Sequence, residues 1–101
     1  MEDINVEEFA DLRLKNTDLQ VLDVREVLEF HTFNIGGLNI PLGKLPETID
    51  NDDLDFDAEQ PIIVICQRGI RSKTAKVILE NAGYKQVRNL TGGLIKLQRI
   101  S

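Results

Sequence analysis

The sequence predicts an α/β sandwich in which a mostly parallel sheet is covered by helices on both faces. Short apolar segments typical of strands alternate with segments whose apolar residues recur at helical spacing. Residues 61–66 are apolar without alternation, as expected of a central strand that is buried on both faces. The 101 residues suit one domain with a modest core, so we expect residues 1–101 to form a single domain.

The N-terminal half contains short elements separated by polar turns. Apolar residues from Val6 to Leu14 recur at helical spacing, and Asn5 is the expected N-cap of this helix. Pro46 limits the start of a later helix, because proline is tolerated only in the first turn. We expect a strand at 19–24, a helix at 26–33 that ends at a turn over 34–37, an extended segment at 38–41 and a helix at 44–51.

The C-terminal half contains the strongest strand and helix signals. After the strand at 61–66, a helix is expected over 72–81 with Gly83 as its stop. A further strand is expected at 86–90, and Gly92 and Gly93 precede a last amphipathic helix at 94–100. The buried face of the helix at 72–81 is predicted to consist of Ala75, Ile78, Leu79 and Ala82.

Composition excludes several classes of protein. A net charge of -5 argues against binding along a phosphate backbone, so we expect no nucleic-acid partner. The longest apolar runs are far shorter than the roughly 20 residues of a membrane span, and the acidic N-terminus lacks signal-peptide features. The single cysteine fits a reducing cytoplasm, and with one histidine it leaves too few soft ligands for a metal site. We therefore expect a cytoplasmic, metal-free monomer.

Acidic residues are concentrated in one stretch of the chain. Seven of them lie between Glu47 and Glu59, with no lysine or arginine among them. A solvated connector is the favoured interpretation, and a docking surface for a basic partner is the alternative.

Cys66 stands where a parallel sheet places its functional residues, directly after the central strand and before a helix. The unpaired amides and dipole of a helix start favour an anion. Gly69 allows the loop to curl, Arg68 and Arg71 add positive charge, and residues 66–79 contain no acid. These features predict a lowered thiol pKa and a nucleophilic thiolate. The alternative, a structural buried cysteine, leaves the two arginines and the glycine unexplained.

Motifs around this loop extend over much of the chain. Residues 66–72 read CQRGIRS; residues 21–25 read VLDVR, with Glu29-Phe30 following; residues 33–41 read FNIGGLNIP; and residues 89–94 read NLTGGL. In their order along the chain they resemble the active-site loop and flanking motifs of the rhodanese family of single-domain sulfurtransferases, over most of residues 19–97. The resemblance implies a three-layer rhodanese-like fold.

The resemblance also implies a reaction. The Cys66 thiolate would take the outer sulfur of a donor such as thiosulfate, become a persulfide, and pass that sulfur to cyanide, a thiol or a sulfur-carrier protein. No general base or cofactor is needed, because the thiolate is already formed. We expect Arg71 to orient the anionic donor and hold the loop shut, and Arg68 to attract the donor at the rim. The other expected substrate-binding residues are Gln67, Gly69, Ile70 and Ser72.

Residues outside the loop are expected to support it. The resemblance makes Asp23 a hydrogen-bond partner behind the loop and Arg25 part of an ion-pair network with Glu29; a surface salt bridge is the alternative reading. His31 is expected to be structural or solvent-exposed. Two positions depart from the family pattern, since Asn34 replaces a usual histidine and Leu97 a usual tryptophan. Both are expected to affect packing or the cleft rim.

Two other functions remain open on the sequence. A cysteine phosphatase or arsenate reductase would need room for a tetrahedral oxyanion, whereas only four residues separate Cys66 from Arg71. Such an enzyme also needs an acid for the leaving group, and the loop contains none. A persulfide carrier or redox sensor would use the same low-pKa cysteine, and the sequence does not separate it from a catalyst.

Overall fold

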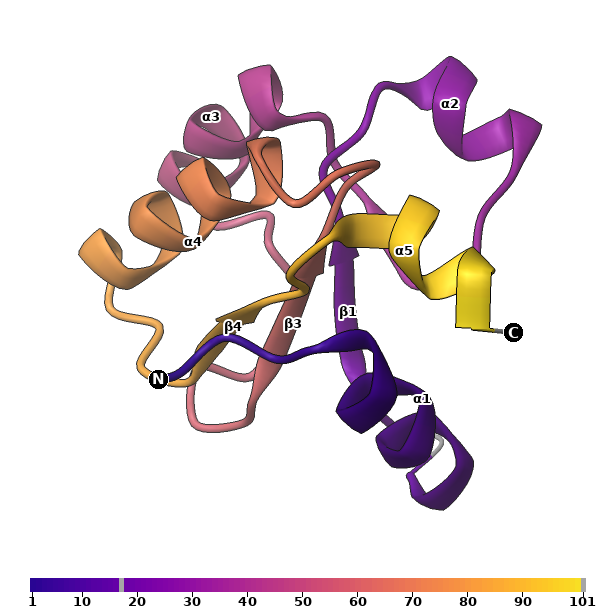
Figure 1. Cartoon of the computed structure of the whole chain (residues 1–101). Coiled ribbons are helices and arrows are strands. Elements are labelled where there is room, and N and C mark those ends of the chain that lie inside the picture. The colour runs from indigo at the N-terminus through magenta and orange to yellow at the C-terminus, as the bar shows by residue number, and fades with distance from the viewer. Residues whose placement is uncertain (17, 101) are drawn as a thin grey trace.

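A computed structural model describes residues 1–16 and 18–100. Its helices and strands alternate along the chain, as the sequence predicts (Figure 1). The element order is α1 (Val6–Lys15), β1 (Gln20–Asp23), α2 (Val27–Thr32), β2 (Leu38–Asn39), a 3-10 turn (Leu42–Lys44), α3 (Leu45–Asp50), β3 (Ile62–Ile65), α4 (Arg71–Asn81), β4 (Val87–Asn89) and α5 (Gly93–Ile100).

The four strands form one parallel sheet in the order β2-β1-β3-β4. Strand β3 is central, and its four residues are all fully buried. It pairs with β1 from Gln20–Ile62 to Asp23–Ile65, so the two strands end side by side. This register places Asp23 and the residue after Ile65 at the same edge of the sheet.

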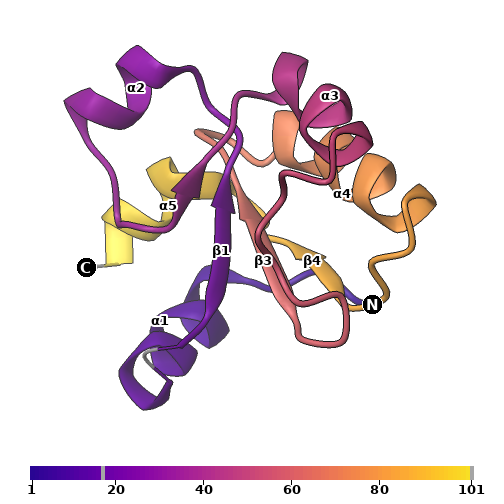
Figure 2. The ribbon, with the colours of Figure 1, turned by 180° about the vertical axis from the view of Figure 1, so that it is seen from behind.

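Helices cover both faces of the sheet, which confirms the predicted α/β class (Figures 1 and 2). On one face, α3 and α4 bury Leu45, Ala75 and Leu79 against side chains of β1, β3 and β4. On the other face, α1 and α5 bury Phe9 and Leu94 against the alternate residues of β3. Each face therefore takes every second residue of β3, which explains why its sequence shows no alternation.

Helix α2 lies beyond the carboxyl end of β1 rather than against either face (Figure 1). None of its residues is fully buried. A capping box fixes its start, because Glu26 accepts the backbone N–H of Glu29 while the Glu29 side chain accepts the N–H of Glu26. The sheet edge where β1 and β3 end is thus covered by a short, half-exposed helix.

The predicted elements occur in the predicted order, with boundaries that differ by a few residues. One packing prediction is wrong: Ala82 is exposed, because α4 ends at Asn81 and Ala82 is its C-cap. Ile78 is half-buried, and Ser72 takes part in the buried face instead. Within residues 1–16 and 18–100, no helix has the length and apolar character needed to cross a bilayer.

Candidate active site

Cys66 lies at the carboxyl end of β3, in the loop that leads into α4. The loop curls around its sulfur: the backbone N–H of Gly69 donates to Sγ over 3.1 Å and that of Ser72 over 3.4 Å. The curl requires φ +88° at Gly69, a conformation that favours glycine. A Cβ there would lie 3.1 Å from the backbone nitrogen of Gly92 and from the carbonyl oxygen of Leu90.

The cysteine is both buried and surrounded by hydrogen-bond donors. Its side chain is 1% exposed, and burial by itself raises the pKa of the thiol. The side chain and N–H of Ser72 and the N–H groups of Arg68 and Gly69 outweigh that effect, so the pKa lies below its ordinary value. The loop therefore favours a thiolate in a place where an unassisted thiol would stay protonated.

The start of α5 holds the loop from behind. The N–H of Leu94 donates to the Cys66 carbonyl over 2.9 Å, and the N–H of Ile95 donates to the Gln67 carbonyl over 3.1 Å. Gly93 makes this approach possible, because a Cβ there would lie 2.4 Å from the Gln67 oxygen. Gly93 thus allows close backbone packing between α5 and the Cys66 loop, whereas a Cβ at Gly92 would meet the Lys96 side chain of α5 itself.

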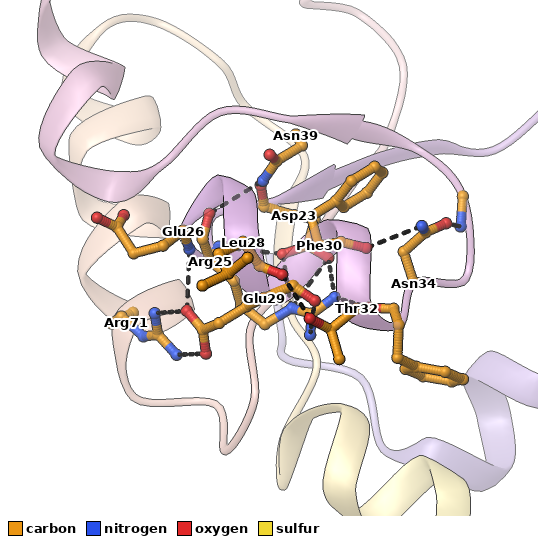
Figure 3. Close-up of polar contacts among 12 residues, drawn as sticks. Asp23, Arg25, Glu26, Leu28, Glu29, Phe30, Thr32, Asn34, Asn39 and Arg71 are labelled. Atoms are coloured by element: carbon orange, nitrogen blue, oxygen red, sulfur yellow. Dashed lines mark hydrogen bonds and ion pairs between the residues drawn. The ribbon is translucent and has the colours of Figure 1, made fainter.

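Arg71 forms a bidentate ion pair with Glu29 of α2 (Figure 3). Its two terminal nitrogens lie 2.6 and 2.9 Å from the two carboxylate oxygens, and both side chains are about one-third exposed. The hydrogen bonds from Arg71 lower the pKa of Glu29 to about 2. Arg71 therefore ties the Cys66 loop to α2, and both of its terminal nitrogens are engaged by the Glu29 carboxylate.

Arg25 does not take the Glu29 carboxylate that the sequence analysis assigned to it. It forms a buried ion pair with Asp23 instead, with NH2 2.8 Å from Oδ2 and Nε 3.1 Å from Oδ1 (Figure 3). Its remaining hydrogen bonds go to the backbone carbonyls of Phe33 and Glu29. Arg25 thereby holds the middle and the C-cap of α2 above the sheet edge, because the buried Asp23 fixes its guanidinium there.

Ser72 and Asn89 form a polar contact that sequence reasoning did not single out. The Ser72 hydroxyl lies 3.3 Å from the Cys66 sulfur and 2.5 Å from Asn89 Oδ1. Asn89 ends β4 and is 3% exposed. The alternation of β4 could have predicted that Asn89 is buried, since Asn89 is two residues after the buried Val87 and shares its inward face.

The other predicted residues lie at the rim or away from the sulfur. Arg68 is exposed, and its side chain makes no hydrogen bond or ion pair with residues 1–16 and 18–100. Ile70 is 72% exposed. Gln67 is half-buried and lines a 660 Å³ groove together with Leu28 and other residues of α2 and with the C-cap residue Phe33. His31 is exposed and contacts the ring of Phe30 edge-on.

The two departures from the family pattern have structural roles. Asn34 closes the turn after α2, because its side chain donates to the Phe30 carbonyl and accepts the N–H of Gly36. Leu97 is buried between α5 and the sheet and also lines a 510 Å³ hollow with Phe33 and Ile35.

In the described part of the chain, no three acidic, histidine or cysteine side chains gather as a metal site would require.

The model of the rhodanese-like domain family matches residues 5–99. The chain belongs to this family. The rhodanese-like relatives include the thiosulfate sulfurtransferase GlpE of Coxiella burnetii, which is 31% identical over 79% of this chain and 72% of its own. A Schizosaccharomyces pombe protein named "Putative thiosulfate sulfurtransferase, mitochondrial" is 35% identical over 75% of this chain and 61% of its own.

Other relatives show different contexts for the same domain. The Bacillus subtilis protein named "Putative sulfur carrier protein YrkF" is 30% identical over 91% of this chain, which spans 48% of that relative. The human single-domain sulfurtransferase TSTD1 has the same rhodanese-like fold, with a TM-score of 0.86 at 21% identity over 98% of this chain and 96% of its own. The domain therefore occurs both nearly alone and as part of longer proteins.

Proposed function

We propose that this rhodanese-like domain is a sulfurtransferase that carries a sulfane sulfur on Cys66, with thiosulfate as a donor. The observation that carries the proposal is the convergence of the Gly69 and Ser72 N–H groups on the Cys66 sulfur at the carboxyl edge of the sheet. Such a cradle stabilises one anionic sulfur, whether it belongs to a thiolate or to a persulfide. The relatives named as thiosulfate sulfurtransferases support the same reaction class.

The reaction consists of two displacements at sulfur. In the first, the Cys66 thiolate attacks the outer sulfur of thiosulfate, the S–S bond of the donor breaks, and sulfite leaves with the electron pair. In the second, an acceptor thiolate or cyanide attacks the outer sulfur of the persulfide, and the electron pair of the broken bond returns to Cys66 as a thiolate. Neither step needs a proton from the protein.

The charged residues have separate roles in this proposal. Arg71 maintains the loop through Glu29, and its charge also favours the nearby thiolate. Arg68 is the exposed cation at the loop and attracts an anionic donor.

A persulfide carrier is the second candidate, because one relative is named as a sulfur carrier protein. A carrier would use the same cradle but would depend on a partner for turnover. A phosphatase is disfavoured by the same geometry, because the acid that pairs with the loop, Glu29, is held as a carboxylate by Arg71. The cytoplasmic location and the monomeric state stay predictions of the sequence.

Thiosulfate:cyanide transfer tests the proposal against both alternatives. The wild-type chain should gain one sulfur, about 32 Da, on incubation with thiosulfate and should turn over when cyanide is added. Cys66→Ser should do neither, and its fold should be unchanged by circular dichroism. A chain that gains one sulfur and does not turn over is a carrier, and a chain that gains none refutes the persulfide.

A further inference from the structure

The active loop contains a closed ring of hydrogen bonds. Gly69 donates its N–H to the Cys66 sulfur and accepts the Asn89 side-chain amide at its carbonyl over 3.2 Å. Asn89 Oδ1 accepts the Ser72 hydroxyl, and the Ser72 oxygen in turn lies 3.3 Å from the same sulfur. All four residues are buried, and no buried side-chain nitrogen or oxygen in the described residues lacks a partner.

The ring gives the Ser72 hydroxyl one proton and two acceptors. Asn89 has a fixed orientation, because its NH2 group must face the carbonyl of Gly69 and its oxygen must then face Ser72. The Ser72 proton can point to Asn89 Oδ1 or, after rotation about the Cβ–Oγ bond, to the Cys66 sulfur. The choice depends on how strongly each acceptor attracts it.

The charge on the sulfur decides between the two acceptors. A thiolate is a strong acceptor, whereas the inner sulfur of a thiol or of a persulfide is a weak one. An amide oxygen lies between these extremes. The proton therefore lies on the side of Asn89 when Sγ is neutral and on the side of Cys66 when Sγ is anionic.

We propose that Asn89 is a positioning residue that holds the Ser72 hydroxyl ready while Cys66 carries sulfur and releases it to the sulfur as the thiolate re-forms. The inference rests on the proposed persulfide cycle. When the acceptor attacks the outer sulfur, the S–S bond breaks and its electron pair stays on Sγ. The hydroxyl then turns from Asn89 to Sγ and donates a hydrogen bond, without transferring its proton.

Charged groups near the ring do not take over this role. The charge of Arg71 acts on Cys66, but its guanidinium is paired with Glu29. Asp3 accepts the backbone N–H of Asn89 and is paired with Lys76, and although burial raises its pKa, these contacts bring the pKa below the ordinary value. Arg68 is exposed at the rim. None of these groups has a hydrogen bond to the Ser72 hydroxyl among the described residues.

Two substitutions of Asn89 separate this role from simple support of the loop. Asn89→Leu removes the competing acceptor, so the Ser72 proton is left to the sulfur and the pKa of Cys66 should fall. Asn89→Asp provides a stronger acceptor and a negative charge, so that pKa should rise. If Asn89 only supports the loop, the pKa of Cys66 should rise in both variants, because a loosened loop loses the N–H groups that stabilise the thiolate.

The ultraviolet absorbance of the thiolate as a function of pH measures this directly, with Cys66→Ser as the blank, because the chain has a single cysteine. Below its pKa, Asn89→Leu should contain several-fold more thiolate than wild type, up to about tenfold, because the variant loses the neutral Ser72–Asn89 hydrogen bond that favours the protonated state. Ser72→Ala should contain less thiolate, and adding Asn89→Leu to Ser72→Ala should restore none of it. Thermal melts identify any variant that fails to fold.

Transfer kinetics complete the test. Asn89→Leu should slow persulfide formation relative to persulfide discharge, because it lowers the free energy of the thiolate relative to that of the persulfide. Asn89→Asp should do the reverse, because it raises the free energy of the thiolate. A lower thiolate content in folded Asn89→Leu, or an Asn89→Leu effect that persists without the Ser72 hydroxyl, overturns the inference. The thiolate measurement needs no sulfur donor. A wild type that fails to turn over therefore contradicts the proposed function, whereas the thiolate content of the variants still tests the role of Asn89.

Discussion

The close approach of α5 to the active loop gives a test in which one added methyl group should distort the site. In Gly93→Ala the new Cβ would lie 2.4 Å from the oxygen, 2.5 Å from the carbonyl carbon of Gln67 and 2.6 Å from the nitrogen of Arg68. These are backbone atoms of the loop that surrounds Cys66, so no side chain can turn away to make room. The residue also has φ +65°, which an L-residue adopts at a cost of about 1–2 kcal/mol.

Gly36→Ala is the matched control. Gly36 has φ +90°, and nothing lies within 4 Å of its would-be Cβ, so it carries the backbone strain without the clash. Overpacking of a tight contact costs about 1–3 kcal/mol. Gly93→Ala should therefore lose about 2–5 kcal/mol and Gly36→Ala about 1–2 kcal/mol. For a domain of this size, each kcal/mol lowers Tm by about 4–8 °C.

Urea unfolding and thermal melts measure these losses, and the thiolate absorbance of Cys66 reports the shape of the loop. Gly93→Ala should lose stability and thiolate together, whereas Gly36→Ala should keep its thiolate. Equal stability losses in the two variants, with Cys66 unchanged in both, would refute the reasoning that the close approach at Gly93 positions the Cys66 loop.

Three further predictions concern the ion pairs around the site. Arg71→Ala should reduce kcat/KM for thiosulfate far more than Arg68→Ala. Because Arg71 acts as a tether, Glu29→Gln should reproduce most of the loss seen in Arg71→Ala. Near-wild-type transfer by folded Glu29→Gln would show that Arg71 acts on the donor directly. The folded-state pKa of Glu29 is about 2 against an ordinary 4.5, so the Arg71–Glu29 ion pair is complete above pH 4.5 and is lost as pH falls through about 2. NMR titration of the Glu29 carboxyl should show this pKa, and in Arg71→Ala the pKa should return toward 4.5. Arg25→Met should cost about 3–5 kcal/mol in urea unfolding, because it leaves the buried Asp23 carboxylate unpaired; Asp23→Asn in the same chain should recover part of that loss, and an additive double variant would argue against the pair.

Local sequence patterns were sufficient for the elements and for the position of Cys66 at the carboxyl end of β3. The apolar run before Cys66, the glycine three residues later and the helix periodicity that follows are all properties of adjacent residues, so their consequences can be read in order along the chain. The same holds for the N-cap at Asn5, which accepts the N–H of Glu8. These features determined the α/β class and the place of the candidate site.

The partners of the charged and polar residues depended on the tertiary structure. Glu29 lies 42 positions before Arg71, and Ser72 lies 17 positions before Asn89. Spacing along the chain does not say which of two arginines reaches Glu29; that depends on how α2 lies over the ends of β1 and β3. The parallel register brings these ends together and thereby decides which groups meet around the sulfur.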